Sequence, residues 1–298
     1  MPSLRTIISV AAVFALAWCN RAVCGDIYDA AAGGDLERVK ELVNANPNLV
    51  NSQETNIPSE LYSETPLALA VEYDRTDVVE FLLANKADVN ARNDRGATPL
   101  CGAVGNTNIL QLLLAKGADV NARTKDGETP LLVAAASGNL DTVKLLLAKK
   151  ADLNAGDNNG NTSLHLAAQN FHTDVTAFLL SKGMDINARN NNGETPLFLV
   201  AFSTGYPEML TLLLAHGADV NARDKFGVTP LHFAAENGST DVPQMLLANG
   251  ADVNAKDNHG RTPLQLVVAA QRRFSKYPEL AKRYAGVANI LRQHGGHE

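Results

Sequence analysis

The sequence predicts an all-α solenoid of about eight helix-turn-helix units joined by β-hairpin-like turns. Two observations carry this prediction: a Thr-Pro motif recurs about every 33 residues, and an Ala-Asp-Val-Asn motif recurs in phase with it. The composition agrees, because 45% hydrophobic and 19% charged residues in a chain of 298 are typical of a globular protein and not of a disordered one.

The Thr-Pro series has seven members spaced 31 to 34 residues apart, with Thr162-Ser163 in the one place that departs from the pattern. Its other members are Thr65-Pro66, Thr98-Pro99, Thr129-Pro130, Thr195-Pro196, Thr229-Pro230 and Thr262-Pro263. The second series ends each time in an asparagine, at Asn90, Asn121, Asn154, Asn187, Asn221 and Asn254. A fixed period of this length indicates stacked copies of one supersecondary unit.

The unit at residues 129–157 shows why the chain folds this way. Thr129 is a favourable N-cap, and Pro130 occupies the first helical position, where its missing N–H costs nothing. Residues 131–135 are apolar and predict a short first helix, which Gly138 and its neighbours end.

A second helix is expected over residues 141–149, with Val143, Leu146 and Leu147 on one face. Residues 157–160, Asp-Asn-Asn-Gly, form the turn to the next unit. A helix pair of this size cannot bury its own apolar face. It has to stack on its neighbours, where each buried Leu or Val contributes about 1.5–3 kcal/mol.

Residues 227–235 (GVTPLHFAA), Leu246-Leu247 and residues 250–254 (GADVN) together resemble the ankyrin-repeat family. The resemblance extends over residues 26–296. It implies an ankyrin-repeat fold, and it implies that His165 and His232 hydrogen-bond within and between units. The fold itself does not identify a partner.

We expect residues 1–24 to be a signal peptide and residues 25–298 to form a single domain. Residues 27–57 form the predicted N-terminal cap unit, and residues 258–296 an extended C-terminal cap unit. The third unit is two residues short after Thr98, which predicts a trimmed first helix. Lys86 and Lys150 replace the Gly that ends other units, and Phe171 replaces a Gly between helices.

The export prediction comes from residues 7–18, an apolar run too short to span a membrane and typical of a secretory signal. Cleavage is expected after Ala17 or after Cys24, and a buried N-terminal helix is the alternative. The mature chain would be secreted or periplasmic, and it would carry −8 charges in place of −6, because Arg5 and Arg21 are lost. It would retain only Cys101, which we expect to be a buried apolar residue.

The sequence predicts no catalytic residues, no metal site and no cofactor. The seven histidines have no metal-ligand spacing, and no phosphate-binding or nucleophile motif is present. The acidic net charge argues against binding of nucleic acid or an anionic membrane by the domain as a whole. We also expect no stable membrane insertion after signal cleavage, and a monomer.

The family resemblance implies that a protein partner binds the hairpin tips and the exposed face of the first helices. Candidate residues on the tips are Arg95, Lys125, Asp126, Asn158, Asn159, Asn191, Asn192, Lys225, Phe226 and His259, and those on the first helices are Gln169, Phe202 and Glu236. Phe202 and Phe226 are the expected anchors, because large aromatic residues are frequent hot spots. The alternative for each is local packing against a neighbouring unit.

Residues 271–284 are a rival site, because basic and aromatic residues alternate there. We interpret this segment first as a solvated cap, and second as a surface for an acidic protein, a phosphate-bearing surface or RNA. The predicted function is therefore an exported, non-catalytic protein-binding module. The alternatives are a secreted effector that acts on another cell, and an accessory or inhibitor of an exported enzyme.

Overall fold

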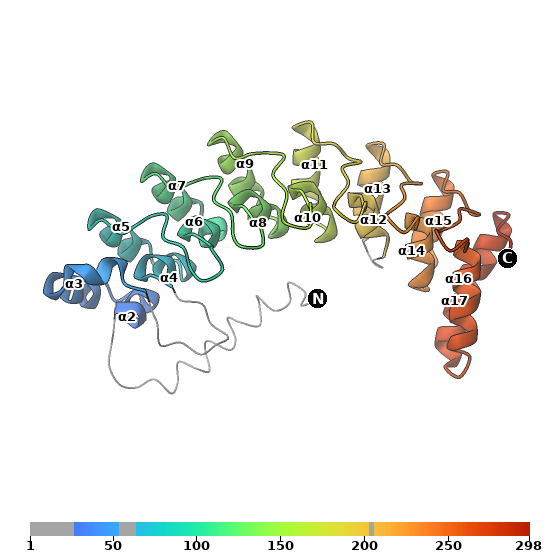
Figure 1. Cartoon of the computed structure of the whole chain (residues 1–298), viewed down its shortest axis with the longest axis horizontal. Helices are drawn as coiled ribbons and strands as arrows, with labels where there is room; N and C mark the ends of the chain where they lie inside the picture. The colour runs from blue at the N-terminus through green and yellow to red at the C-terminus, as the bar shows by residue number, and fades with distance from the viewer. Residues whose placement is uncertain (1–26, 54–63, 203–205) are drawn as a thin grey trace. The chain divides into compact units, whose positions relative to one another are not determined.

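The computed structural model describes residues 27–53, 64–202 and 206–298 and shows them to be helical, as predicted (Figure 1). The expected signal peptide with both cleavage positions lies outside these residues. The chain forms two compact units, Met1–Asp88 and Val89–Glu298, which are considered separately.

The first unit contains α2 (Ile27–Gly33), α3 (Leu36–Ala45), the 3-10 helix η1 (Pro47–Asn51), α4 (Pro66–Glu72) and α5 (Thr76–Ala84). Helix α2 packs against α3 and α4. Arg75 from the loop before α5 donates to the carbonyl of Ala32 over 2.8 Å. Asn51 donates to the carbonyl of Lys86 and accepts from the N–H of Asp88. Side chains thus connect successive helix pairs within this unit.

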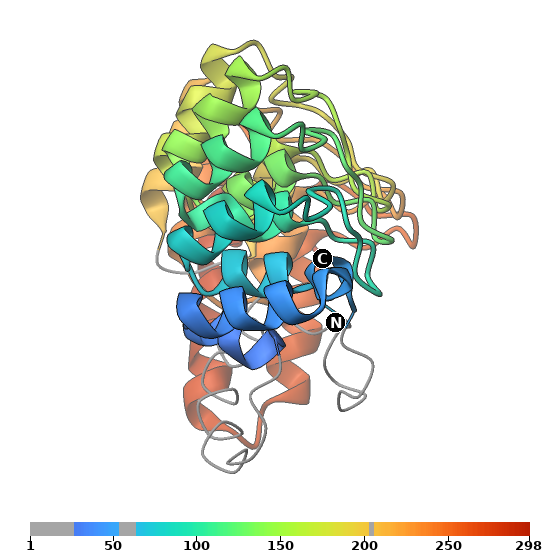
Figure 2. The ribbon, with the colours of Figure 1, turned by 90° about the vertical axis from the view of Figure 1, so that its left-hand side faces the viewer.

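The second unit is a series of helix pairs. They are α6 (Pro99–Gly102) with η2 (Ala103–Gly105) and α7 (Thr107–Ala115); α8 (Pro130–Ala136) and α9 (Leu140–Ala148); α10 (Ser163–Gln169) and α11 (Thr173–Ser181); α12 (Pro196–Ala201) and α13 (Pro207–Ala215); α14 (Pro230–Glu236) and α15 (Asp241–Ala248); and α16 (Pro263–Arg273) and α17 (Pro278–Gln293). Within this unit the first helices form one row and the second helices another, and the hairpin loops lie together on one side (Figure 2).

The α8–α9 pair shows the capping that the sequence predicts. The hydroxyl of Thr129 accepts from the N–H of Leu132 over 3.3 Å, and Pro130 opens α8. The second helix of this pair begins and ends one residue earlier than expected. In five of the six pairs a leucine of the second helix is fully buried at an equivalent position, namely Leu113, Leu146, Leu179, Leu213 and Leu246.

Departures from the repeat consensus change the local structure. Helix α6 has four residues where α8 and α10 have seven, which confirms the trimmed helix of the third unit. Lys86 and Lys150 have φ of 67° and 69°, and Phe171 has φ of 62°. A left-handed backbone costs a residue with a side chain about 1 kcal/mol relative to glycine.

Candidate protein-binding surface

Successive hairpin tips are joined by backbone hydrogen bonds. The N–H of Lys125 donates to the carbonyl of Arg95 over 2.7 Å, and the N–H of Asn158 donates to that of Asp126 over 2.9 Å. The same bond continues from Asn191 to Asn159, from Lys225 to Asn192 and from Asn258 to Phe226. Because each tip is fixed by its neighbour, the predicted tip residues form one ordered edge of the second unit.

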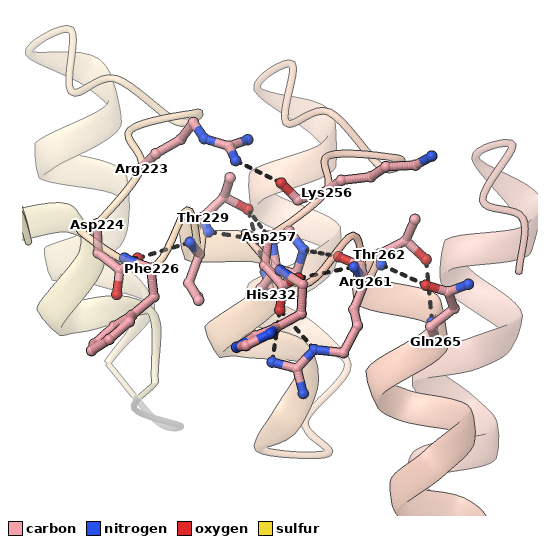
Figure 3. Close-up of polar contacts among 12 residues, drawn as sticks. Arg223, Asp224, Phe226, Thr229, His232, Lys256, Asp257, Arg261, Thr262 and Gln265 are labelled. Atoms are coloured by element: carbon pink, nitrogen blue, oxygen red, sulfur yellow. Dashed lines mark hydrogen bonds and ion pairs between the residues drawn. The ribbon is translucent and has the colours of Figure 1, made fainter.

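Two further series of bonds join the hairpins at their base. The Asn121 side chain accepts from the N–H of Asp152 over 2.8 Å, and Asn187 and Asn221 do the same to the next hairpin. Arg123 donates to the carbonyl of Gly156 over 2.6 Å, and Arg223 to that of Lys256 over 2.6 Å (Figure 3). The repeated Asn is therefore a structural residue.

Both base series are interrupted at the same junction. Gly156 stands where the other hairpins have Arg92, Arg123, Arg189 and Arg223, and so has no guanidinium to donate. The side chain of Asn154 makes no hydrogen bond with any described residue of the following hairpin. The tip bonds remain, because the Asn191 side chain donates to the carbonyl of Asn158 over 2.9 Å and that of Asn190 to the Asn161 side chain over 2.9 Å.

The two predicted structural histidines are confirmed in this role. Nδ1 of His232 lies 2.9 Å from the hydroxyl of Thr229, and Nε2 lies 3.0 Å from the carbonyl of Arg261 in the next hairpin (Figure 3). His165 makes the equivalent contacts with Thr162 and Glu194. A carbonyl only accepts, so Nε2 carries the proton and Nδ1 accepts. Burial lowers the pKa of both rings, because it disfavours the charged form.

Asp257 organises the last hairpin. Its carboxylate accepts from the N–H groups of His259 and Arg261 and from the guanidinium of Arg261, the latter over 2.7–2.8 Å (Figure 3). Burial by itself raises the pKa of Asp257. The hydrogen bonds to the charged form outweigh this effect, so the pKa is lowered overall.

The predicted binding residues are at the surface. All are exposed except Asn192, which is half-buried. Arg95 and Asp126 approach each other to 3.8 Å across adjacent tips, and Lys225 donates to the Asn192 side chain. The tips therefore present mixed charge on a fixed backbone.

The two expected anchors lie in different surroundings. Phe226 is 55% exposed, and its ring lies 5.1 Å from the ammonium of the adjacent Lys225. Phe202 is 47% exposed and ends α12, where its ring lies 4.7 Å from that of Phe233 on α14. Local packing and exposure thus coexist at Phe202, and the structure does not gather Phe202 and Phe226 into one aromatic cluster.

Other aromatic side chains also pair between neighbouring helix pairs. Phe233 also stacks on Phe198, with ring centroids 5.0 Å apart. Phe171 stacks on Tyr206 at 3.9 Å, and Tyr206 is itself 51% exposed. The candidate binding residues predicted from the sequence include neither Tyr206 nor Phe233.

A half-buried apolar stripe runs across four successive first helices. It consists of Val133, Leu166, Leu199 and Phe233, each four residues after the threonine that begins its helix. The sequence interpretation overlooked this stripe. The sequence contains the pattern that could have revealed it. The same position of the repeat is apolar in four consecutive units, while the position three residues further varies.

The described residues contain no group of three or more His, Cys, Asp or Glu side chains placed to hold a metal ion. Cys101 is a free, buried thiol, and burial raises its pKa. None of the helices in the described ranges is both long and apolar enough to cross a membrane.

Stacked helix pairs with an ordered tip edge define a helical-repeat scaffold. Comparison with known families specifies the class. Ankyrin repeats (3 copies) match residues 27–124, 103–190 and 131–224, and ankyrin repeats (many copies) match residues 213–267. The chain therefore belongs to the ankyrin-repeat family, which consists of non-catalytic scaffolds for protein–protein interaction.

Proposed function

We propose that this chain is an exported, non-catalytic module that binds a protein partner through its hairpin tips and first-helix face. The observation that carries the proposal is the exposure of Phe202, whose ring contacts Phe233 of the half-buried stripe on α8 to α14, together with the exposure of Tyr206. Folding alone does not require two aromatic side chains to remain half exposed beside such a stripe.

The stripe indicates what kind of segment the partner offers. Packed helices lie about 8–10 Å apart, so consecutive stripe residues are separated by roughly that distance. A polyproline II segment advances about 3.1 Å per residue with three residues per turn, and a helix advances about 1.5 Å per residue. A matching segment therefore has an apolar residue at every third position of polyproline II or at every seventh position of a helix. Gln169, Glu236 and the tip residues form the polar rim that specific interfaces need.

Export and the monomeric state are part of the proposal. Residues 1–24 support export through their signal-like pattern, which would place the protein outside the cell or in the periplasm. The acidic net charge favours partners with basic patches. A resident partner would fit a scaffold, or an accessory or inhibitor of an exported enzyme. A target in another cell would fit a secreted effector.

The test is a crosslinking pull-down of the tagged full chain from the cells that produce it. The wild type is compared with Phe202→Ala/Phe226→Ala and with Lys144→Ala/Lys182→Ala, a control on the second helices. We expect a stoichiometric partner whose affinity falls about 30-fold or more in the phenylalanine variant and is retained in the lysine variant. Equal capture by all three forms would contradict this surface, and finding the chain only in the cytosol would contradict export.

A further inference from the structure

The last helix pair is longer than its neighbours. Helix α16 has 11 residues where α14 has seven, and α17 has 16 where α15 has eight. At 1.5 Å per residue, the extra length is about 6 Å on α16 and 12 Å on α17. Figure 1 shows this pair reaching past the end of α14. A cap needs to cover only the helices beside it, so the projection does more than close the stack.

The projecting end, residues 272–283, is strongly basic. It contains Arg272, Arg273, Lys276, Lys282 and Arg283 against the single acid Glu279, in a chain whose net charge is −6. None of these five cations forms an ion pair with a described residue. Asp241 and Glu279 line the same shallow hollow as Lys282 and Arg283, whereas Arg272, Arg273 and Lys276 do not line it.

Apolar groups occupy the extreme end of the projection. Tyr277, in the turn between the helices, is 61% exposed, and Leu280, in the first turn of α17, is 36% exposed. The arrangement is an aromatic and an aliphatic side chain at the end, with basic residues beside them.

The projection is held in place from within. Phe274 stacks on Tyr284 with ring centroids 5.7 Å apart, and the guanidinium of Arg273 lies over the Phe274 ring, 5.4 Å from its centroid. The hydroxyl of Tyr284 donates to the carbonyl of Glu236 over 3.0 Å, which ties the extension to α14. The basic and apolar end is therefore preorganised.

We infer that the end of the α16–α17 pair docks on the surface of an anionic phospholipid membrane. Tyrosine favours the depth of the headgroups, and each lysine or arginine near an anionic bilayer adds to the attraction. A projecting end fits a broad surface, whereas an acidic peptide is better held in a groove. The shallow hollow beside Lys282 and Arg283 also contains Asp241 and Glu279, which disfavour an acidic peptide. The acidic remainder of the chain orients the molecule, because only this end is attracted.

The test uses the full chain with its single tryptophan removed by Trp18→Phe, so that one new tryptophan reports on one site. Tyr277→Trp places the reporter at the projecting end, and Phe226→Trp places a control reporter at an exposed hairpin tip. Vesicles contain brominated phosphatidylcholine, alone or mixed equally with phosphatidylglycerol. Bromine quenches a tryptophan only when the ring enters the bilayer. Quenching is therefore independent of any binding by residues 1–24.

We expect the reporter at position 277 to be quenched by the mixed vesicles and not by phosphatidylcholine alone, with no quenching at position 226. Raising the salt from 0.1 M to 1 M shortens the Debye length from about 10 Å to about 3 Å and should abolish the effect. Arg272→Gln/Arg273→Gln/Lys276→Gln should weaken partitioning on the order of 100-fold. The matched Arg95→Gln/Lys125→Gln/Lys225→Gln change should leave it unaltered.

Absence of quenching at position 277 with phosphatidylglycerol would overturn the inference, as would equal quenching in both lipids. Binding of the same end to an acidic protein without quenching would also overturn it and assign the charge to a protein partner. Circular dichroism of each variant confirms that its helices are intact. Tyr277→Trp and Arg272→Gln/Arg273→Gln/Lys276→Gln lie outside the proposed partner surface, and only the control changes fall within it. This test and the pull-down therefore fail independently.

Discussion

Thr176 is the residue whose environment fits its chemistry least well. It lies on α11 at the position that Val143 occupies on α9, it is fully buried, and its hydroxyl has no hydrogen-bond partner among the described residues. A buried polar group without a partner costs about 1–3 kcal/mol. Thr142, also fully buried, differs in that its hydroxyl donates to the carbonyl of Val104 over 2.8 Å.

We predict that Thr176→Val raises the free energy of unfolding by about 1 kcal/mol, because valine keeps the shape and removes the hydroxyl. Urea unfolding should show a higher midpoint with an unchanged m-value. Thr142→Val is the control and should lower the midpoint, since it strands the Val104 carbonyl. Destabilisation by both changes would mean that the Thr176 hydroxyl has a partner in solution.

Some single residues were predictable and others were not. The left-handed backbone at Lys86 and Lys150 could be anticipated, because each stands where other units have a glycine. The orphaned hydroxyl of Thr176 did not, because a threonine on a helix usually reaches a carbonyl or water. Whether it does so depends on the packing of the neighbouring pair and not on local sequence.

Among the elements, the first helices differ in how they are capped. In α10 and α14 the ring of His165 or His232 accepts from the N–H of the capping threonine. In α16 the side chain of Gln265 does so over 2.9 Å. A protonated ring has no free lone pair at Nδ1, so protonation removes this bond, and glutamine is insensitive to pH.

Acidification should therefore destabilise the fold through these two helices. The folded-state pKa of each ring lies below the unfolded value of about 6.5, so the unfolded chain binds the protons first. Stability is complete above about pH 6.5 and falls as the pH drops through the folded-state values. We predict that His165→Gln/His232→Gln flattens this decline while costing about 1 kcal/mol per site at high pH, where the Nε2 bonds are lost.

The measurement is urea unfolding of wild type and variant at a series of pH values. The decline below about pH 4 should persist in both, because the lowered pKa of Asp257 contributes stability that is lost only there. Parallel curves between pH 7 and 5 would show that the histidines are not the sensitive groups.

The helices also differ in how fully they could be predicted from the sequence. Two missing residues predicted the short α6, and the added residues 271–284 were recognised. Their form was not predictable, because the helical extension depends on the stacking of Phe274 on Tyr284 and on the bond from Tyr284 to α14.

At the scale of the second unit, the junction between the hairpin at residues 150–161 and the next hairpin has the fewest hydrogen bonds of the hairpin junctions that the structure describes. It keeps the tip bonds and lacks both base bonds, because Gly156 has no side chain to donate. Gly156 has an ordinary backbone conformation, and an added Cβ would lie 3.5 Å or more from its neighbours. The site therefore accommodates a side chain.

We predict that Gly156→Arg stabilises the unit by about 1 kcal/mol, by donating to the carbonyl of Arg189 as Arg123 does to Gly156. Amide hydrogen exchange should slow in residues 183–194. In the wild type, the N–H of Asp185 should exchange on the order of tenfold faster than the equivalent N–H groups of Asp152 and Asp219, which donate to asparagine. Arg223→Gly is the converse control. Equal exchange at all these amides would contradict a weak junction.

The candidate surface was predictable in outline, because tips and first helices followed from the repeat. The aromatic residues that contribute to this surface were less predictable. Phe233 and Tyr206 contact aromatic side chains from other units, and such contacts depend on how units stack.

The tip bonds pass through main-chain atoms, and this has an evolutionary consequence. Arg95, Lys125 and Lys225 take part in that edge through their N–H and carbonyl groups, which every amino acid except proline supplies. Mutation can exchange their side chains without disturbing the architecture beneath. Selection can therefore redirect what this edge recognises one codon at a time, and each intermediate along such a lineage remains a folded protein.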